Sequence, residues 1–252
     1  MQRIPAVLSG LLLSAAVGAQ PPPAVRITVA YEWSGWGHEA GTWIIERGHD
    51  GVDRRQDVGT TQDSADRVHV LPASAVDALL AATDGPAPSR ESVIAQLAAG
   101  LDRDAVARLD PTVRSFPAAA CTYAVQQAWV RRVLTDEELR RRVEQIVSGL
   151  WTDDYPVMTV TVQQQGRPPI TFFSHAQGPA MLPWKQVPAG ETDPQTLEQQ
   201  PDQWRIDLSR AVDGLLPLDM GSRARFQPSW LQRQVGMRLQ LDAQACGKPR
   251  GR

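Results

Sequence analysis

Lysine is scarce in this chain of 252 residues, and a surplus of basic charge is absent. Of the 26 basic residues only Lys185 and Lys248 are lysine, and 28 acidic residues give a formal net charge of −2. Proteins whose main partner is a nucleic acid or an anionic membrane usually carry a basic surplus. The sequence therefore predicts neither of these as the partner.

Long apolar runs are also missing, except at the N-terminus. Residues 1–19 combine Arg3, an apolar stretch from Ile4 to Val17 and small residues before Gln20, which is the pattern of a cleavable signal peptide. The stretch is too short for a stable membrane span, although an uncleaved anchor helix is the alternative. A Pro-rich linker at 20–24 follows, without the cysteine that a lipid anchor needs. We expect an exported protein of bacterial type, periplasmic or secreted, with no integral membrane segment after cleavage.

Cysteine occurs only twice, at Cys121 and Cys246. In an oxidising compartment an isolated pair predicts a disulfide. The bridge would tether the tail formed by residues 247–252. The alternative is that Cys121 is simply a small buried residue.

Histidine occurs four times, and no two histidines have the short spacing of a zinc site. His38-Glu39 lacks the second histidine of the metalloprotease helix motif. A site assembled from His38, His49 and Asp50 would need the surrounding loops to fold together, and surface histidines are the simpler interpretation. The sequence predicts no metal and no cofactor.

Sequence motifs of nucleophilic catalysis are lacking too, because no Gly-x-Ser-x-Gly elbow occurs. The nearest combination is Ser174-His175, with Asp153 and Asp154 upstream. Neighbours on a strand point to opposite faces, so Ser174 and His175 can act together only if the strand ends or bulges there. The two aspartates are more simply a turn. A hydrolase that uses His175 with Ser174 or Asp153/Asp154 is thus the alternative hypothesis, and no catalytic residue is assigned.

The most regular pattern is the alternation of apolar and polar residues over 25–33, which predicts a half-buried strand. Ser34 to Gly41 is expected to turn the chain before a second strand that begins at Trp43. Asp50-Gly51 is typical of a tight hairpin. Residues 25–71 are therefore predicted to form an antiparallel meander.

Helical spacing begins after Pro72, with Ser74 as the expected cap, and resumes after a break at 84–89. The strongest helix follows Thr135, which starts a capping box with Glu138. The run Arg140 to Arg142 is interpreted as a solvated helix face paired with glutamates.

The second part of the chain repeats this order. A hairpin is predicted over 158–173, a loop over 176–201, a helix from Asp202 to Leu216 and a last strand over 235–241. Strands followed by helices indicate an α+β fold of antiparallel hairpins or meanders packed with amphipathic helices. The stretches 25–82 and 155–217 suggest two similar strand-then-helix halves. We predict a single domain over 25–246, with a division into 25–100 and 101–246 as the alternative.

Tryptophan is unusually frequent, with eight residues against three tyrosines and four phenylalanines. Trp36 is flanked by glycines, and Trp184 lies in the Pro-rich loop, so both could anchor a partner. The alternative is that each packs back onto the sheet. The sequence favours a non-catalytic binding or interaction module of the cell envelope over an enzyme. Its partner is expected to be a protein or envelope component, bound by Trp36, His38, His175 and Trp184.

Overall fold

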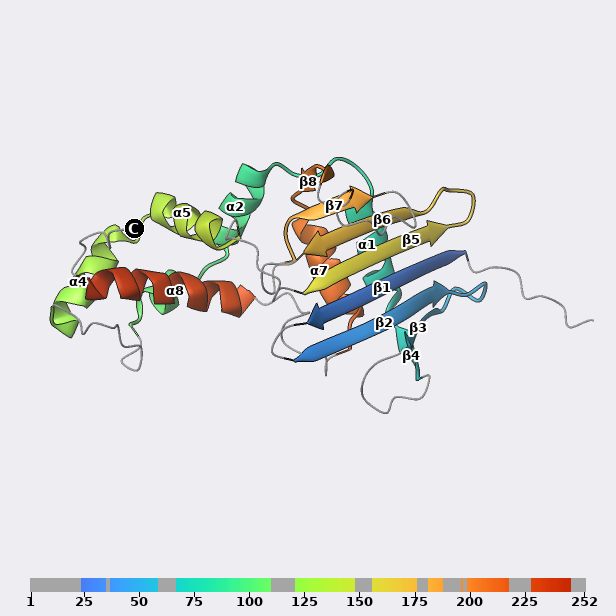
Figure 1. The fold of residues 1–252 in the computed structure, drawn as a ribbon, viewed down its shortest axis with the longest axis horizontal. Helices are drawn as coiled ribbons and strands as arrows, with labels where there is room; N and C mark the ends of the chain where they lie inside the picture. Colours follow the sequence, from blue (N-terminus) through green and yellow to red (C-terminus); the bar gives the residue numbers. More distant parts are fainter. Residues whose placement is uncertain are drawn as a thin grey trace, which may run out of the picture.

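The computed structural model describes residues 24–34, 37–58, 67–109, 121–147, 156–175, 181–187, 196, 199–217 and 228–245. The predicted signal peptide and the tail at 247–252 lie outside these ranges. The described residues have the predicted α+β fold, with one antiparallel sheet and helices beside and behind it (Figure 1).

The sheet contains eight strands in the order β4-β3-β2-β1-β5-β6-β7-β8, and every neighbouring pair is antiparallel. The predicted meander over 25–71 is confirmed, and the predicted hairpin over 158–173 is the start of a second meander. The strands are β1 (Val25–Ser34), β2 (His38–Arg47), β3 (Asp53–Val58), β4 (Val68–Leu71), β5 (Val157–Gln164), β6 (Ile170–His175), β7 (Trp184–Val187) and β8 (Asp202–Gln203).

Each run of four strands is followed by one helix, α1 (Ala73–Thr83) or α7 (Ile206–Leu215). We call β1–β4 with α1 the first half and β5–β8 with α7 the second half; together they form the sheet lobe. The halves meet at the centre of the sheet, where β1 pairs with β5. The predicted repetition of strands and then a helix is therefore present in the topology.

The helices α1 and α7 contact each other and cover one face of the sheet, called the inner face (Figure 1). The alternation of apolar and polar residues along β1 determines which face the helices cover. Val25, Ile27, Val29 and Tyr31 are all buried on this face, while the residues between them are half-buried or exposed. Residues that pair across strands share a face, so the same alternation extends over the sheet. The opposite side is called the outer face.

Two buried arginines connect the halves. Arg55 of β3 donates to the carbonyl oxygen of Leu215 at the end of α7, at 3.0 Å. Arg205, next to the start of α7, donates to the carbonyl oxygen of Ala82 in the last turn of α1 at 3.1 Å, and to that of Gly85, just after this helix, at 2.8 Å. Each half thus supplies partners for the last carbonyl groups of the other half's helix, which an isolated helix leaves unpaired.

The remaining helices form a helical lobe beside the sheet (Figure 1). Buried apolar residues of both lobes belong to one contiguous cluster. The helices of this lobe are α2 (Arg90–Ala99), α3 (Arg103–Ala107), α4 (Tyr123–Val133), α5 (Asp136–Val147) and α8 (Pro228–Gln244). In the alternative division of the chain into 25–100 and 101–246, helix α2 belongs to the first part. It packs on α5, which belongs to the second part.

Helix α5 begins at the predicted capping box, of which one of the two bonds is present. The amide of Glu138 donates to Thr135 Oγ1 at 3.1 Å, but the Glu138 carboxylate accepts hydrogen bonds from Arg141 and Arg142. Burial opposes the charged form, yet these bonds prevail and hold the pKa of Glu138 below its usual value. The interpretation of Arg142 as solvated is wrong, because its side chain is 8% exposed and bonds Asp242 of α8 at 2.5 Å.

Three local predictions need correction. Ser74 does not cap α1, whose N-cap is Pro72 without a side-chain bond. The second strand begins at His38, well before Trp43, because Ser34 and His38 already pair across the hairpin. The Pro-rich stretch 176–201 contains β7, and its placement in the sheet buries Trp184.

The predicted last strand over 235–241 is wrong, since these residues lie in α8. Apolar residues in this segment alternate with polar ones, as in a strand, but apolar residues also recur every four positions, as in a helix. Packing against the other helices stabilises the helix. The buried apolar residues of this helix are Leu231, Val235, Leu239 and Ala243. Among the helices that the structure describes, none is long and apolar enough to cross a membrane.

Candidate functional site

The two histidines predicted to bind a partner lie on the outer face. His38 is exposed and opens β2, while His175 is half-exposed and ends β6. Both are at the same end of the sheet, where Glu32 pairs with Val157 and Val157 pairs with His175. Three interstrand spacings separate β2 from β6, so the backbones of the two residues are at least about 14 Å apart. They can contact one large partner but cannot act on the same atom.

The two predicted tryptophan anchors differ. Trp36 lies outside the described residues, in the two-residue gap before Gly37. Trp184 has no exposed surface, and its indole donates to Ser209 Oγ at 2.9 Å. A fully buried indole cannot reach a partner on the surface, so the prediction that Trp184 is an anchor is wrong. The alternative, a tryptophan packed against the sheet, is what the structure has.

The structure does not bring Ser174 and His175 together. The pairing of Met158 with Ser174 places Ser174 on the inner face, where it is 1% exposed and donates to the carbonyl oxygen of Pro183 at 3.1 Å. His175 lies on the other face, edge to face with Phe173. Asp153 and Asp154 lie outside the described residues.

Cys121 is half-buried next to the end of α8, with its sulfur 3.4 Å from the carbonyl oxygen of Ala243. It is not a free cysteine. Cys246 lies outside the described residues, so its pairing with Cys121 stays a prediction. Across the part of the chain that the structure describes, no group of three His, Cys, Asp or Glu residues could hold a metal ion.

The centre of the outer face carries no charged side chain. Threonines dominate it, and two of its cross-strand pairs are Thr28 with Thr161 and Ala30 with Thr159. None of the described helices lies over this face (Figure 1). The centre consists of six half-buried residues: Thr28, Ala30, Thr42, Ile44, Thr159 and Thr161.

Charged groups lie around this centre. Arg26 bonds Glu46 at 2.9 Å along one side, and Glu32 is exposed toward the histidine end. On the β7 side, Lys185 lies 3.3 Å from Asp202. Three apolar outer-face residues between the centre and this pair, Phe173, Val187 and Val157, form a small cluster. The outer face is therefore an uncharged strip with a charged border.

The β2–β3 turn at the border is held by an ion pair. Arg54 donates to both carboxylate oxygens of Asp50, and the Val52 amide donates to the same group at 3.0 Å. These bonds lower the pKa of Asp50 to about 2 and raise the pKa of Arg54. The turn itself is closed by Gly51 at φ +74°, where other residues would be strained.

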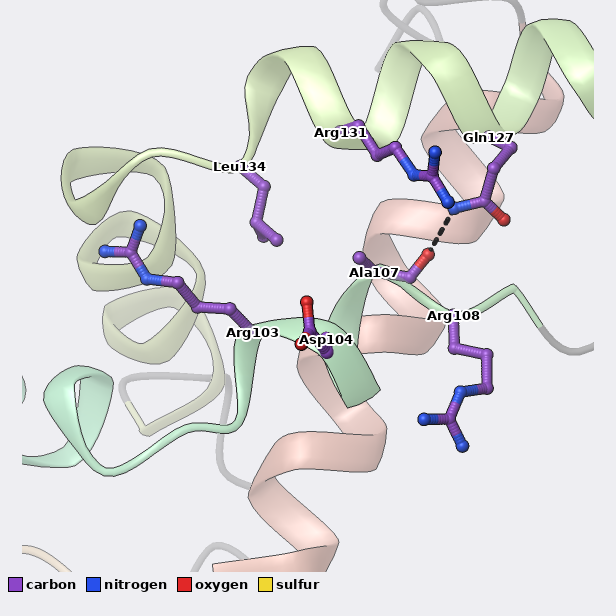
Figure 2. Close-up of a pocket in the computed structure, with 7 residues that line it drawn as sticks. All are labelled: Arg103, Asp104, Ala107, Arg108, Gln127, Arg131 and Leu134. Atoms are coloured by element: carbon purple, nitrogen blue, oxygen red, sulfur yellow. Dashed lines mark hydrogen bonds between the residues drawn. The ribbon is translucent and has the colours of Figure 1, made fainter.

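A pocket lies in the helical lobe, between α3 and α4 (Figure 2). We call it the arginine hollow; its volume is about 500 Å³. Gln127 of α4 donates to the carbonyl oxygen of Ala107 at 2.7 Å and joins its two walls. The lining residues are Arg103, Asp104, Ala107, Arg108, Gln127, Arg131 and Leu134.

The arginine hollow could not be found from the sequence, because its residues come from separate helices. Arg131 and Arg132 at the end of α4 look alike in the sequence, and either would complement the helix dipole. Only the packing of α3 against α4 selects Arg131 for the lining. The outer face was partly foreseeable, since the polar positions of residues 25–33 are those that it exposes.

No family model, no curated protein and no solved structure matches the chain in the comparisons.

Proposed function

We propose that the chain is a non-catalytic binding module of the cell envelope that holds a protein or envelope component on the outer face of its sheet. The observation that carries the proposal is the uncharged centre of this face with its charged border. Protein interfaces have the same anatomy, because charged groups are depleted in the buried core of a contact and tolerated at its rim.

The residue types at the centre also support binding. Threonine presents a methyl group and a hydroxyl group on a stiff side chain, so ordering it at an interface costs little conformational entropy. Thr161 Oγ1 already lies 3.1 Å from Thr171 Oγ1, which fixes its orientation. His38 and His175 extend the surface at one end.

The proposal is tested by a photo-crosslinking amino acid at Thr159, in the centre of the outer face, in the producing cells. We expect a discrete adduct that mass spectrometry identifies, and its loss when Thr161→Arg is added. The matched control carries the crosslinker at Ala78, an exposed position on α1. Equal adducts from both positions, or none from Thr159, would refute binding by the outer face.

Export is part of the proposal and has its own readout. The intact mass of the protein recovered outside the cytoplasm should correspond to a chain that begins at Gln20. Alkylation of the unreduced protein should label neither Cys121 nor Cys246. A full-length mass in that fraction would contradict cleavage after Ala19, and two labelled thiols would contradict the bridge.

A further inference from the structure

We propose that the arginine hollow binds an acidic peptide segment, independently of the outer face. Its lining has three guanidinium groups and one carboxylate, that of Asp104. The hollow is thus a positively charged recess in a chain whose formal net charge is negative.

The three arginines of the lining differ in their ion pairing within the described residues. Arg103 is ion-paired with Asp136 of α5. For Arg108 and Arg131, in contrast, no carboxylate among the described residues lies within ion-pair distance. Many other arginines of the described chain are paired, including Arg26 and Arg54 in the sheet lobe. These two guanidinium groups, which no carboxylate of the described residues pairs, line one recess and can bind an anion.

The directions of the side chains favour an extended ligand. In Figure 2, Arg131 hangs from α4 on one wall, while Arg103 and Arg108 leave the opposite wall and point away from each other. One compact anion cannot bridge guanidinium groups that diverge in this way. A peptide with carboxylates on successive residues can meet them one at a time, each by a charge-assisted hydrogen bond. Leu134 and Ala107 offer apolar contacts for the methylene groups of its side chains.

The experiment measures the fluorescence anisotropy of a labelled hexaglutamate peptide with the purified full chain at about 0.1 M salt, where the Debye length is about 10 Å. The double variant Arg108→Gln with Arg131→Gln should weaken binding about tenfold, since two charge-assisted pairs are lost. The matched control, Arg132→Gln with Arg140→Gln, removes the same charge from exposed helix positions that do not line the hollow. It should weaken binding less than about twofold, because exposed charges that make no contact are screened.

A variant that is expected to tighten binding, rather than weaken it, strengthens the test. Asp104→Asn removes the carboxylate of the lining and should tighten binding about two- to threefold, since a repulsion is removed. The N-cap of α3 is Asp102, so this change leaves the cap intact. Equal losses in the two double variants, no binding by the unmodified chain, or equal binding of a hexalysine peptide would each overturn the proposal.

Discussion

The first and second halves of the sheet lobe have the same order of elements but stabilise their shared helix pair differently. In the first half, the inner face of β3 consists of Asp53, Arg55 and Asp57, all less than 9% exposed. Arg55 bonds Asp57 at 2.8 Å as well as α7. In the second half, β7 places Trp184 on the inner face, and the helix contacts come from Arg205.

The environment of each arginine follows from this difference. Arg55 is balanced by a buried carboxylate, whereas among the described residues Arg205 donates hydrogen bonds only to two backbone carbonyl oxygens and to the side chain of Gln203. Burial lowers the pKa of Arg205, and the guanidinium lies 5.4 Å from the ring centroid of Phe172. The first half therefore contacts the helix of the second half through an arginine in a buried ion pair. The second half contacts the helix of the first half through an arginine surrounded by carbonyl groups and an aromatic ring.

Breaking the ion pair should have the largest effect. Arg55→Met removes the arginine partner of buried Asp57 and leaves it only His69, at 3.5 Å. Breaking a buried pair in this way costs about 3–5 kcal/mol of unfolding free energy. Arg205→Met removes bonds to carbonyls at a partly exposed helix end, which water can replace, and should cost about 1.5–3 kcal/mol. Urea unfolding of both variants measures the difference. Adding Asp57→Asn to Arg55→Met should restore part of the loss, and a larger loss for Arg205→Met would contradict this account.

A smaller difference is expected between the two inner-face tryptophans, Trp43 of β2 and Trp184 of β7. Trp184→Phe removes the bond to Ser209 and leaves a cavity, at a cost of about 1–3 kcal/mol. The Trp43 Nε1 is buried and has no hydrogen-bond partner in the described chain, so Trp43→Phe removes an unsatisfied group. We expect its cost to be at least about 1 kcal/mol smaller. Thermal unfolding of the two variants would disprove this if the order were reversed.

The smallest effect concerns the turns. The pKa of Asp50 is lowered to about 2, so the ionised carboxylate supports the β2–β3 turn fully above its usual pKa near 4. That support is lost as the pH falls through about 2. The amide NMR signal of Val52 should titrate with this midpoint and should not do so in Asp50→Asn. In the β5–β6 turn Arg167 bonds the neutral side chain of Gln164, and the carboxylate 3.6 Å from it, that of Asp84, belongs to a segment outside the turn, so the Gly166 signal should shift less.

The comparison of the halves also shows what could be predicted from the sequence. Alternation over 25–33 predicts β1, and Asp50-Gly51 predicts the following turn, because both depend on residues close in the chain. The pairing of β1 with β5 depends on residues far apart, and no local pattern indicates it. Trp184 illustrates the limit, since its proline-rich surroundings indicate a loop and its burial comes from pairing with β6 and β8.

The same limit applies to the candidate surfaces. His38 and His175 were predicted, and the structure adds that they share the outer face at one end of the sheet. The threonines between them come from three strands, and their assembly requires the strand order. For α8, the four-residue period and the alternation at 235–241 coexist in the sequence. Packing against α3, α4 and α5 decides between them.

The central position of the β1–β5 pair has a consequence for how the chain acquires its structure. The paired residues are 125 to 139 positions apart, so closing this contact requires a long loop and carries a large entropic cost. During synthesis, β1 can pair with β2 at once, but its other edge stays open until helices α1 to α5 and then β5 have been made. An open strand edge is where chains aggregate. The middle of the finished sheet therefore stays unprotected while the residues between β1 and β5 are made, and the growing chain is vulnerable there until β5 pairs with β1.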